Sequence, residues 1–264
     1  MTETSQIRKA DALALAVCIA IGIACLGATG ETGRKRAKEV VCLAHLQQWG
    51  SFFLSYIDDH DGYFNPGWQV GETELWMNAL RPYYQDRWPL LFCPTAKRAG
   101  GPGINPGTFI AWSRSIRLPG GDRQLHVSSY GINSWTNNMT SNRGNRMAEW
   151  FWRSPRDIPN AHRVPVFADS IWHDAWPQPM DWPAPVPIDR GWADVTSEMN
   201  QFCIDRHNGA VNFLFMDFSA RKVGLKELWT LRWHRQFDTA GPWTKAGGVT
   251  TADWPQWMRG FKDY

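Results

Sequence analysis

The strongest constraint on the fold is an apolar run near the N-terminus, ALALAVCIAIGIACLGA, which covers residues 12–28. It contains no charge, no side-chain amide and no proline. As a helix rising about 1.5 Å per residue, it is long enough for a short membrane span. Further along, apolar or small residues recur every three or four positions at Leu46, Gly50, Phe53 and Ile57. That spacing predicts an amphipathic helix packed on a folded domain.

This pattern divides the chain into a short polar leader (residues 1–11), a transmembrane and amphipathic helix (residues 12–57) and an exported globular domain (residues 58–264). The apolar run could be a cleaved secretory signal, a lipoprotein signal that uses Cys25, or a permanent anchor. The amphipathic helix directly downstream favours the anchor. Basic residues at 34–38 follow the run and leave the membrane topology open.

The composition indicates a domain rich in loops. The chain of 264 residues has 17 Trp, 23 Gly and 17 Pro, and 43% hydrophobic residues, enough for one good core. Exposed tryptophans stack on sugar rings, so a membrane-anchored carbohydrate-binding surface protein is an alternative. Burial of the tryptophans in the core is the competing interpretation. A net charge of +3 without a long basic block argues against nucleic acid as a partner.

The five cysteines divide by location. Cys18 and Cys25 lie in the apolar run, whereas Cys42, Cys93 and Cys203 lie outside it. In an exported domain, a disulfide between Cys42 and Cys93 would tie the helix to the domain and leave Cys203 unpaired. Three free buried thiols are an equally open interpretation.

Two groups of ionisable residues invite a metal or an active site. Asp58, Asp59 and Asp61 suggest a calcium site, but the twelve-residue loop that ends in a bidentate Glu is absent. A solvated turn is therefore the preferred interpretation, and no other cofactor is expected. Candidates for a metal or acid/base site elsewhere are Asp169, His173, Asp174, Asp205, His207 and Asp217.

None of these residues has the spacing of a helical zinc motif, and the chain has no G-x-S-x-G motif or phosphate-binding glycine loop. A salt-linked or hydrogen-bonded hairpin is favoured over a catalytic site, so the chain is not expected to be an enzyme. A hydrolase using the region of His207 and Asp217 is the least favoured alternative.

Local patterns predict an α+β fold, with a small antiparallel sheet packed on the long N-terminal helix. An irregular Trp/Pro-rich lobe is expected at residues 171–193. Helices are expected at 74–84 and 225–237, and strands at 88–95, 107–116, 128–135, 164–169 and 211–216.

The segment RKRAKE followed by VCLAHLQQWGSFFLSYIDDHDGYF, with matches at Cys42, Leu43 and Leu46, resembles the N-terminal helix of type IV pilin-like proteins. It is most similar to the type II secretion pseudopilins of the Planctomycetes type. A second match is His207 with Asp217 ten positions later, although the family has Asp-Gly where this chain has Asp-Phe.

The resemblance implies a structural subunit of a type II secretion pseudopilus or pilus-like assembly. The subunit would cross the inner membrane once, hold its globular domain in the periplasm or at the cell surface, and contact like subunits and other secretion components. The family also has a Cys-Pro pair at the position of Cys93, which makes Cys93 the natural partner of Cys42.

The chain departs from the family at the prepilin processing site, where the Gly-Phe-Thr-Leu-Ile-Glu motif is missing. Alignment from Cys42 places the cleavage point between Gln6 and Ile7. It places Asp11 at the family's glutamate, which pairs with the N-terminal amine of a neighbouring subunit in the assembly. Capping of the helix by Asp11 at the membrane interface is the equally open alternative.

Overall fold

The fold is α+β, as predicted, in a computed structural model that describes residues 17–18, 30–97, 105–189 and 196–264. One long helix, α2 (Glu31–Asp59), is followed by two short helices, α3 (Trp76–Ala79) and α4 (Arg81–Tyr84). The strands are β1 (Trp112–Arg117), β2 (Arg123–Ser128), β3 (Tyr130–Asn133), β4 (Pro165–Asp169), β5 (Asp174–Ala175), β6 (Ala210–Phe215) and β7 (Ala220–Gly224). Short 3-10 turns and loops make up most of the remaining described chain.

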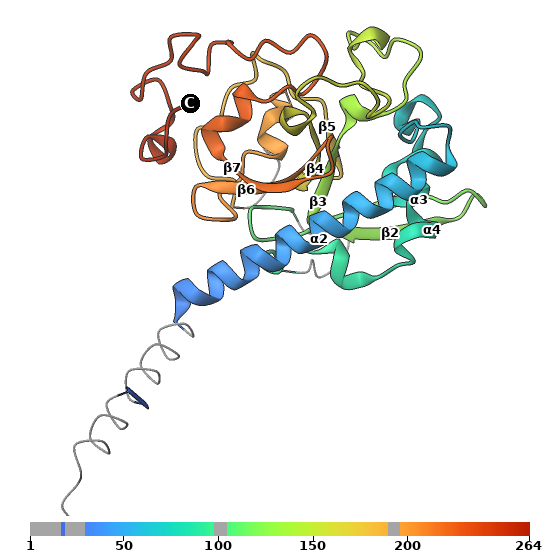
Figure 1. Cartoon of the computed structure of the whole chain (residues 1–264), viewed down its shortest axis with the longest axis horizontal. Helices are drawn as coiled ribbons and strands as arrows, with labels where there is room; N and C mark the ends of the chain where they lie inside the picture. The colour runs from blue at the N-terminus through green and yellow to red at the C-terminus, as the bar shows by residue number, and fades with distance from the viewer. Residues whose placement is uncertain (1–16, 19–29, 98–104, 190–195) are drawn as a thin grey trace, which may run out of the picture.

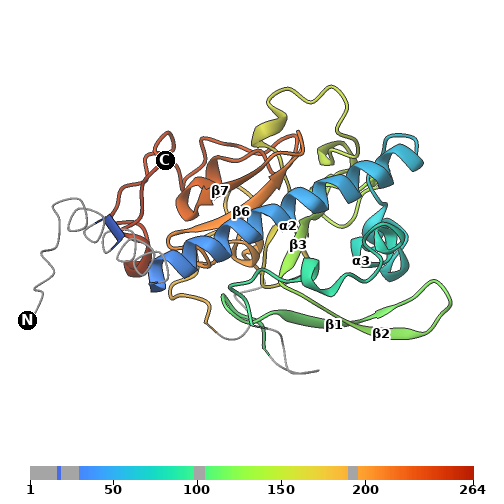
Figure 2. The same cartoon turned by 60° about the horizontal axis from the view of Figure 1, so that its bottom comes forward.

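The strands form two sheets. The larger has the order β5-β3-β4-β6-β7, antiparallel throughout except for the short parallel pair β3–β5. The smaller is the antiparallel hairpin β1–β2. Figure 2 shows α2 running between β6 and β7 on one side and the β1–β2 hairpin on the other. The helix packs on β4, β6 and β7 of the larger sheet.

Helix α2 has an exposed first part and a buried second part. No residue from Glu31 to Val41 is buried, and Cys42 is the first residue of the helix that is fully buried. Figure 1 shows the start of the helix projecting away from the domain, and contact with the sheet begins at Glu39, whose carboxylate lies 2.8 Å from Nζ of Lys222 on β7. The apolar positions from Leu46 to Ile57 then face the core, which is the amphipathic face that the sequence predicts.

The helix approaches the sheet closely at Gly50. A Cβ atom there would lie 3.1 Å from Cδ1 of Leu214 on β6, so the absence of a side chain permits the close packing. Next to it, the Trp49 ring meets the rings of Trp76 and Phe167 at centroid distances of 5.3 and 5.0 Å. Large aromatic rings thus fill the space between helix and sheet.

Most of the tryptophans are core residues. Eight are fully buried: Trp49, Trp76, Trp112, Trp135, Trp152, Trp229, Trp233 and Trp254. Several donate their indole N–H to a loop carbonyl, for example Trp76 to His173 (2.8 Å), Trp152 to Trp233 (3.0 Å) and Trp229 to Asp181 (2.7 Å). These indole donors satisfy buried loop carbonyls that have no partner in a helix or a sheet, which a domain with little regular structure requires.

Some predicted elements differ from those observed. The strands expected at 164–169 and 211–216 are present as β4 and β6. The strand expected at 88–95 is wrong: Trp88–Leu91 is a 3-10 turn, because Pro89 cannot donate to a strand ladder. The helix expected at 225–237 is also wrong beyond Thr230, where the 3-10 turn Leu225–Thr230 ends.

Within the described part of the chain, no helix combines the length and the apolar character that crossing a bilayer requires. Most of the predicted span of residues 12–28 lies outside the described residues. The same holds for four residues of the predicted leader, assembly position and lipoprotein signal: Gln6, Ile7, Asp11 and Cys25.

Candidate functional site

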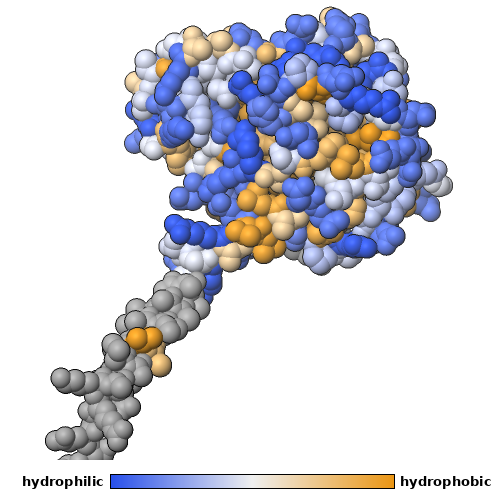
Figure 3. Space-filling model, viewed as in Figure 1, coloured by the Kyte–Doolittle hydropathy of each residue, from blue (hydrophilic) through white to orange (hydrophobic). Residues whose placement is uncertain are grey.

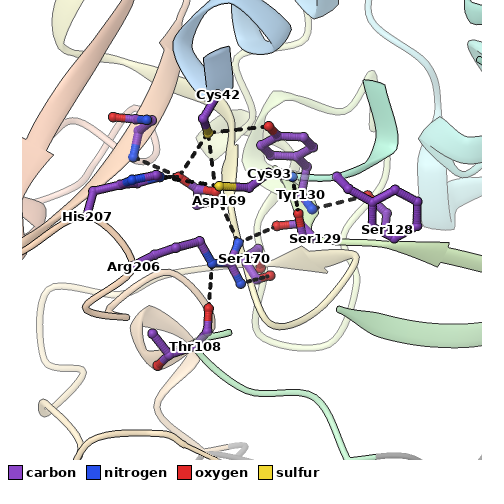
Figure 4. A network of polar contacts seen from close by, with 12 residues as sticks. Cys42, Cys93, Thr108, Ser128, Ser129, Tyr130, Asp169, Ser170, Arg206 and His207 are labelled. Atoms are coloured by element: carbon purple, nitrogen blue, oxygen red, sulfur yellow. Dashed lines mark hydrogen bonds and ion pairs between the residues drawn. The ribbon is translucent and has the colours of Figure 1, made fainter. Parts of the chain in front are cut away.

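Four chain segments that are far apart in sequence bring two thiols, a carboxylate and an imidazole together. Cys42 lies on α2, Cys93 follows the 3-10 turn Trp88–Leu91, Asp169 ends β4, and His207 precedes β6. One donor atom from each of the four lies within 4.8 Å of every other, and all four residues are buried. Figure 4 shows Cys42, Cys93 and His207 around Asp169. We call these four residues the thiol cluster.

The backbone explains how Asp169 and His207 meet. Strand β4 pairs with β3 so that Asp169 lies opposite Tyr130. His207 is placed just before β6 by a turn in which Asn208 (φ 55°) and Gly209 (φ 78°) are both left-handed. Asparagine and glycine adopt this conformation at the lowest cost, so the Asn-Gly pair fixes where the histidine side chain begins.

Asp169 is the centre of the polar contacts. Its Oδ2 atom lies 3.0 Å from Nε2 of His207 and accepts the backbone N–H of Asn212 at 3.0 Å. Its Oδ1 atom lies 3.1 Å from Nη1 of Arg206. The side chains of Asp169 and Arg206 have no exposed surface, so this carboxylate–guanidinium pair is fully removed from water.

The two thiols complete the cluster. Sγ of Cys93 lies 3.4 Å from Nε2 of His207, and the Cys42 thiol donates to Oδ2 of Asp169 at 3.5 Å. The Tyr130 hydroxyl donates to Sγ of Cys42 at 3.3 Å. Each sulfur therefore faces a polar group instead of the apolar surroundings in which a structural cysteine usually lies.

Arg206 is held on every side by the chain. Besides Asp169, its guanidinium donates to the backbone carbonyls of Thr108 (2.6 Å), Ser129 (2.7 Å) and Ser170 (3.3 Å). Four hydrogen-bonded partners satisfy a buried positive charge that would otherwise be very costly. The arginine thereby fixes Asp169 in position beside the two thiols.

Burial and charge perturb the acidities of the four groups. Burial alone would raise the pKa of Asp169 and lower that of His207. Their mutual attraction prevails: the pKa of Asp169 is held well below its usual range and that of His207 is raised to about 10. Burial raises the pKa of Cys42. Burial would also raise the pKa of Cys93, but hydrogen bonds with Cys42 and His207 outweigh it and lower the pKa of Cys93 to about 6. Both shifts favour the charged forms, the thiolate of Cys93 and the imidazolium of His207.

This arrangement is not that of a cysteine nucleophile with its base. In such a site the thiol and the carboxylate use different nitrogens of the imidazole ring. Here Nε2 of His207 faces both Cys93 and Asp169. Cys93 has no exposed surface and His207 only 4%, so the sulfur is enclosed by protein. The geometry instead directs several ligand atoms towards one enclosed point.

A second buried histidine–aspartate pair lies on the other side of β3. Nδ1 of His173 is 3.0 Å from Oδ1 of Asp174, and Nε2 of His173 is 2.5 Å from Nη1 of Arg114. Oδ2 of Asp174 accepts the indole N–H of Trp68 at 2.6 Å. We call Arg114, His173 and Asp174 the His173 cluster. Both ring nitrogens of His173 face protein groups.

The sequence left open whether His207 and Asp217 touch, and in the structure they are apart. The two residues lie at opposite ends of β6, because the intervening segment is an extended strand and not two arms of one hairpin. Asp217 instead accepts the backbone N–H and the hydroxyl of Ser219 in the turn before β7. Asp205 accepts the N–H of Gly209 and also stabilises a turn.

The three aspartates proposed for calcium do not converge. Asp58, Asp59 and Asp61 are exposed at the C-terminal end of α2, and Asp59 accepts the Tyr83 hydroxyl at 2.8 Å. Among the described residues, the one group of His, Cys, Asp and Glu side chains that could hold a metal ion is the thiol cluster. The aspartates therefore fit the solvated turn that was the preferred interpretation.

The predicted cysteine pair is brought together. Cys42 and Cys93 are adjacent as free thiols, whereas Cys203 is a free thiol buried elsewhere in the core. Sequence reasoning named all four members of the thiol cluster, but it did not place them in one site. Arg206 was missed, and its one signal was a charged residue directly before His207 in a segment leading into a core strand.

Comparisons with protein-family models, with curated proteins and with solved structures give no match.

Proposed function

We propose that this protein is a pilin-like structural subunit, anchored in the inner membrane by its N-terminal segment and assembled with like subunits through its N-terminal helix. The observation that carries this proposal is the form of α2. Its second half is built into the core, whereas the helix before Glu39, which pairs with Lys222 on β7, projects from the domain and is available to a neighbour. The apolar run of residues 12–28 directly upstream suits the same role.

The exposed first part of the helix also offers apolar contacts. Val40 is 65% exposed and Val41 44%. Figure 3 shows a hydrophobic patch on the lower edge of the domain, beside the point where the helix leaves it. Exposed apolar surface at the base of a projecting helix is suited to helix–helix packing between subunits.

Site-specific photocrosslinking in membranes of the native host tests the assembly. A benzophenone amino acid at Val40 should give crosslinked species containing two or more copies of this chain. Val70 is 62% exposed on the globular domain and serves as the matched control, which should give few or none. A monomer as the sole product at Val40, with the chain at its native level, would reject the proposal.

The N-terminus of the membrane-derived protein provides an independent test. A start at Ile7 supports processing at the position that the resemblance suggests. A start near Thr29, or a lipid on Cys25, would overturn the anchor, because the apolar run would then be removed or replaced.

A second candidate function is carbohydrate binding, and one surface feature favours it. Trp182 is 51% exposed and lines a surface hollow of about 360 Å³ together with Trp243, Met180 and Asp253. An exposed indole beside a carboxylate is suited to stacking on a sugar ring and accepting its hydroxyls. The other strongly exposed tryptophan in the described part of the chain is Trp88, at 43%.

These two tryptophans form a matched pair for a binding test. Soluble β-glucan and chitin oligosaccharides are titrated into the full chain in detergent, with intrinsic fluorescence as the readout. Trp182→Ala should abolish a saturable signal that Trp88→Ala retains. A wild-type protein that gives no saturable signal, or equal loss in both variants, would reject carbohydrate binding at this hollow.

A further inference from the structure

The donor atoms of the thiol cluster form a ligand set typical of zinc. Two sulfurs, one imidazole nitrogen and one carboxylate oxygen lie within 4.8 Å of one another. Thiolate and imidazole ligands favour Zn²⁺ over Ca²⁺ or Mg²⁺, which prefer oxygen. Four protein ligands that enclose a point without solvent access are characteristic of structural zinc sites, whereas catalytic sites keep one position open.

Three distances between the ligand atoms are close to those of a tetrahedron around one ion, and all the others are within 4.8 Å. Zinc bonds of about 2.3 Å to sulfur and about 2.0 Å to nitrogen or oxygen place neighbouring ligands roughly 3.3–3.8 Å apart. The separations are 3.4 Å from Cys93 Sγ to His207 Nε2 and 3.5 Å from Cys42 Sγ to Asp169 Oδ2. The 3.0 Å between His207 Nε2 and Asp169 Oδ2 needs to open by a few tenths of an ångström.

The surroundings complete the site. Zn²⁺ held by two thiolates, one carboxylate and a neutral imidazole carries a single net negative charge, which the Arg206 guanidinium beside Asp169 compensates. The Tyr130 hydroxyl and the Asn212 N–H donate to Cys42 and Asp169. Such donors to the ligand atoms orient them and tune the site in known metalloproteins.

We propose that Cys42, Cys93, Asp169 and His207 bind one structural Zn²⁺ ion. The ion joins α2 to β4, to the segment after Leu91 and to the segment before β6. Its binding energy therefore stabilises the attachment of the projecting helix to the domain. This inference does not depend on the proposed assembly function, because the site lies wholly within one chain.

Zinc binding is measured on the full chain in detergent, after reduction and removal of metal by a chelator. Elemental analysis after loading with Zn²⁺ should give one ion per chain. Loading with Co²⁺ should give the visible ligand-field bands of tetrahedral cobalt and a thiolate-to-cobalt charge-transfer band. The cobalt spectrum uses the wild-type protein, so it tests the ligand set even where a variant fails to fold.

Variants identify the ligands. Cys93→Ser should weaken Zn²⁺ binding by at least about 100-fold in competition with a chromophoric chelator. Cys203→Ser is the matched control: it removes another buried thiol outside the cluster, and affinity should remain within a few-fold of wild type. Cys18→Ser, at the exposed cysteine, checks for adventitious binding and should leave the stoichiometry unchanged.

Three outcomes would overturn the proposal. The first is less than half an ion per reduced chain, or a cobalt spectrum without the thiolate band. The second is equal affinity in Cys93→Ser and Cys203→Ser. The third is a disulfide between Cys42 and Cys93 in zinc-free protein from native membranes, detected as a mass lower by two hydrogens and two fewer titratable thiols.

Discussion

The thiol cluster and the His173 cluster both place a buried histidine and aspartate beside an arginine, and they differ in which group faces the imidazole. Arg206 adjoins the thiol cluster, Arg114 belongs to the His173 cluster, and the two clusters lie on either side of β3. In the first, Arg206 contacts the carboxylate and a thiol faces Nε2 of His207. In the second, Arg114 occupies the space at Nε2 of His173. The position of the arginine therefore decides whether a metal ion could reach the ring nitrogen.

The largest effect is expected from removing the carboxylate charge of the thiol cluster. Asp169→Asn leaves the Arg206 guanidinium buried without a counter-ion, which should lower the free energy of unfolding by about 3–5 kcal/mol. Asp174→Asn should cost less, about 1–3 kcal/mol, because Arg114 is partly exposed and also pairs with Glu72. Urea denaturation of both reduced, metal-free variants at pH 7 measures the difference, and equal losses would contradict the comparison.

A third buried histidine, His234, tests whether an adjacent carboxylate controls the charge state of a buried imidazole. His234 faces the amide of Gln178 at 3.2 Å instead of a carboxylate, and burial lowers its pKa to about 4. The imidazole of His234 is protonated near pH 6.5 in the unfolded chain and near pH 4 in the folded chain. Stability from this group is therefore complete above pH 6.5 and is lost as pH falls, by up to about 1.4 kcal/mol per unit.

His234→Phe should remove this part of the pH dependence. Denaturation between pH 7 and 4 should give a shallower fall in the free energy of unfolding for the variant than for wild type. The other buried histidines are the same in both proteins, so the difference isolates His234. Parallel curves would show that its charge state does not depend on burial in the way described.

Strand β3 lies between the two clusters and pairs with the strands that carry Asp169 and Asp174, so strain in it should disturb both. Gly131 lies where a Cβ atom would collide with the carbonyl oxygen of Trp172 and with Ser170. Gly131→Ala should therefore cost about 1–3 kcal/mol of unfolding free energy. Gly120→Ala is the control, because a Cβ there meets no atom within 4 Å. Similar thermal midpoints for the two variants would contradict the close packing at β3.

The smallest effects are expected from single hydroxyl deletions. Tyr130→Phe removes a donor to the Cys42 sulfur, and Ser134→Ala removes a donor to Oδ2 of Asp174. Sulfur is a weak acceptor and a carboxylate a strong one, so the losses should be below about 1 kcal/mol and about 1–2 kcal/mol, respectively. The order of the two unfolding free energies is the test, and the reverse order would contradict it.

The sequence predicted those helices and strands in which apolar residues recur at a regular spacing. The spacing from Leu46 to Ile57 gave the buried face of α2, and the alternation at 164–169 and 211–216 gave β4 and β6. The predictions failed at 88–95 and beyond Thr230, where local apolar content suggested regular structure. There, tertiary contacts such as the Trp49 indole donating to the Leu90 carbonyl determine the backbone.

The sequence identified the four residues of the thiol cluster, but it did not show that they lie together in space. Cys42 and Cys93 were expected to meet, and Asp169 and His207 were named as candidates separately. Their convergence depends on the register of β4 against β3 and on the left-handed turn at Asn208, which place two distant side chains at one point. No spacing in the sequence encodes that register. Asp217 was named together with His207 because their ten-position spacing matches the resembled family, and that spacing does not make them contact.

The position of Cys42 has a mechanical consequence. It is the first fully buried residue of α2, and among the described residues only the partly exposed Glu39–Lys222 ion pair and the Asn212–Glu39 hydrogen bond precede it, so tension along the projecting helix reaches the core at Cys42. The contacts of α2 with β4, β6 and β7 resist that tension in shear along the helix axis. A metal ion bound by the thiol cluster, as proposed above, would join the helix to the domain at the end of the interface that such a load reaches first. It would therefore oppose separation of the helix from the sheet at that end.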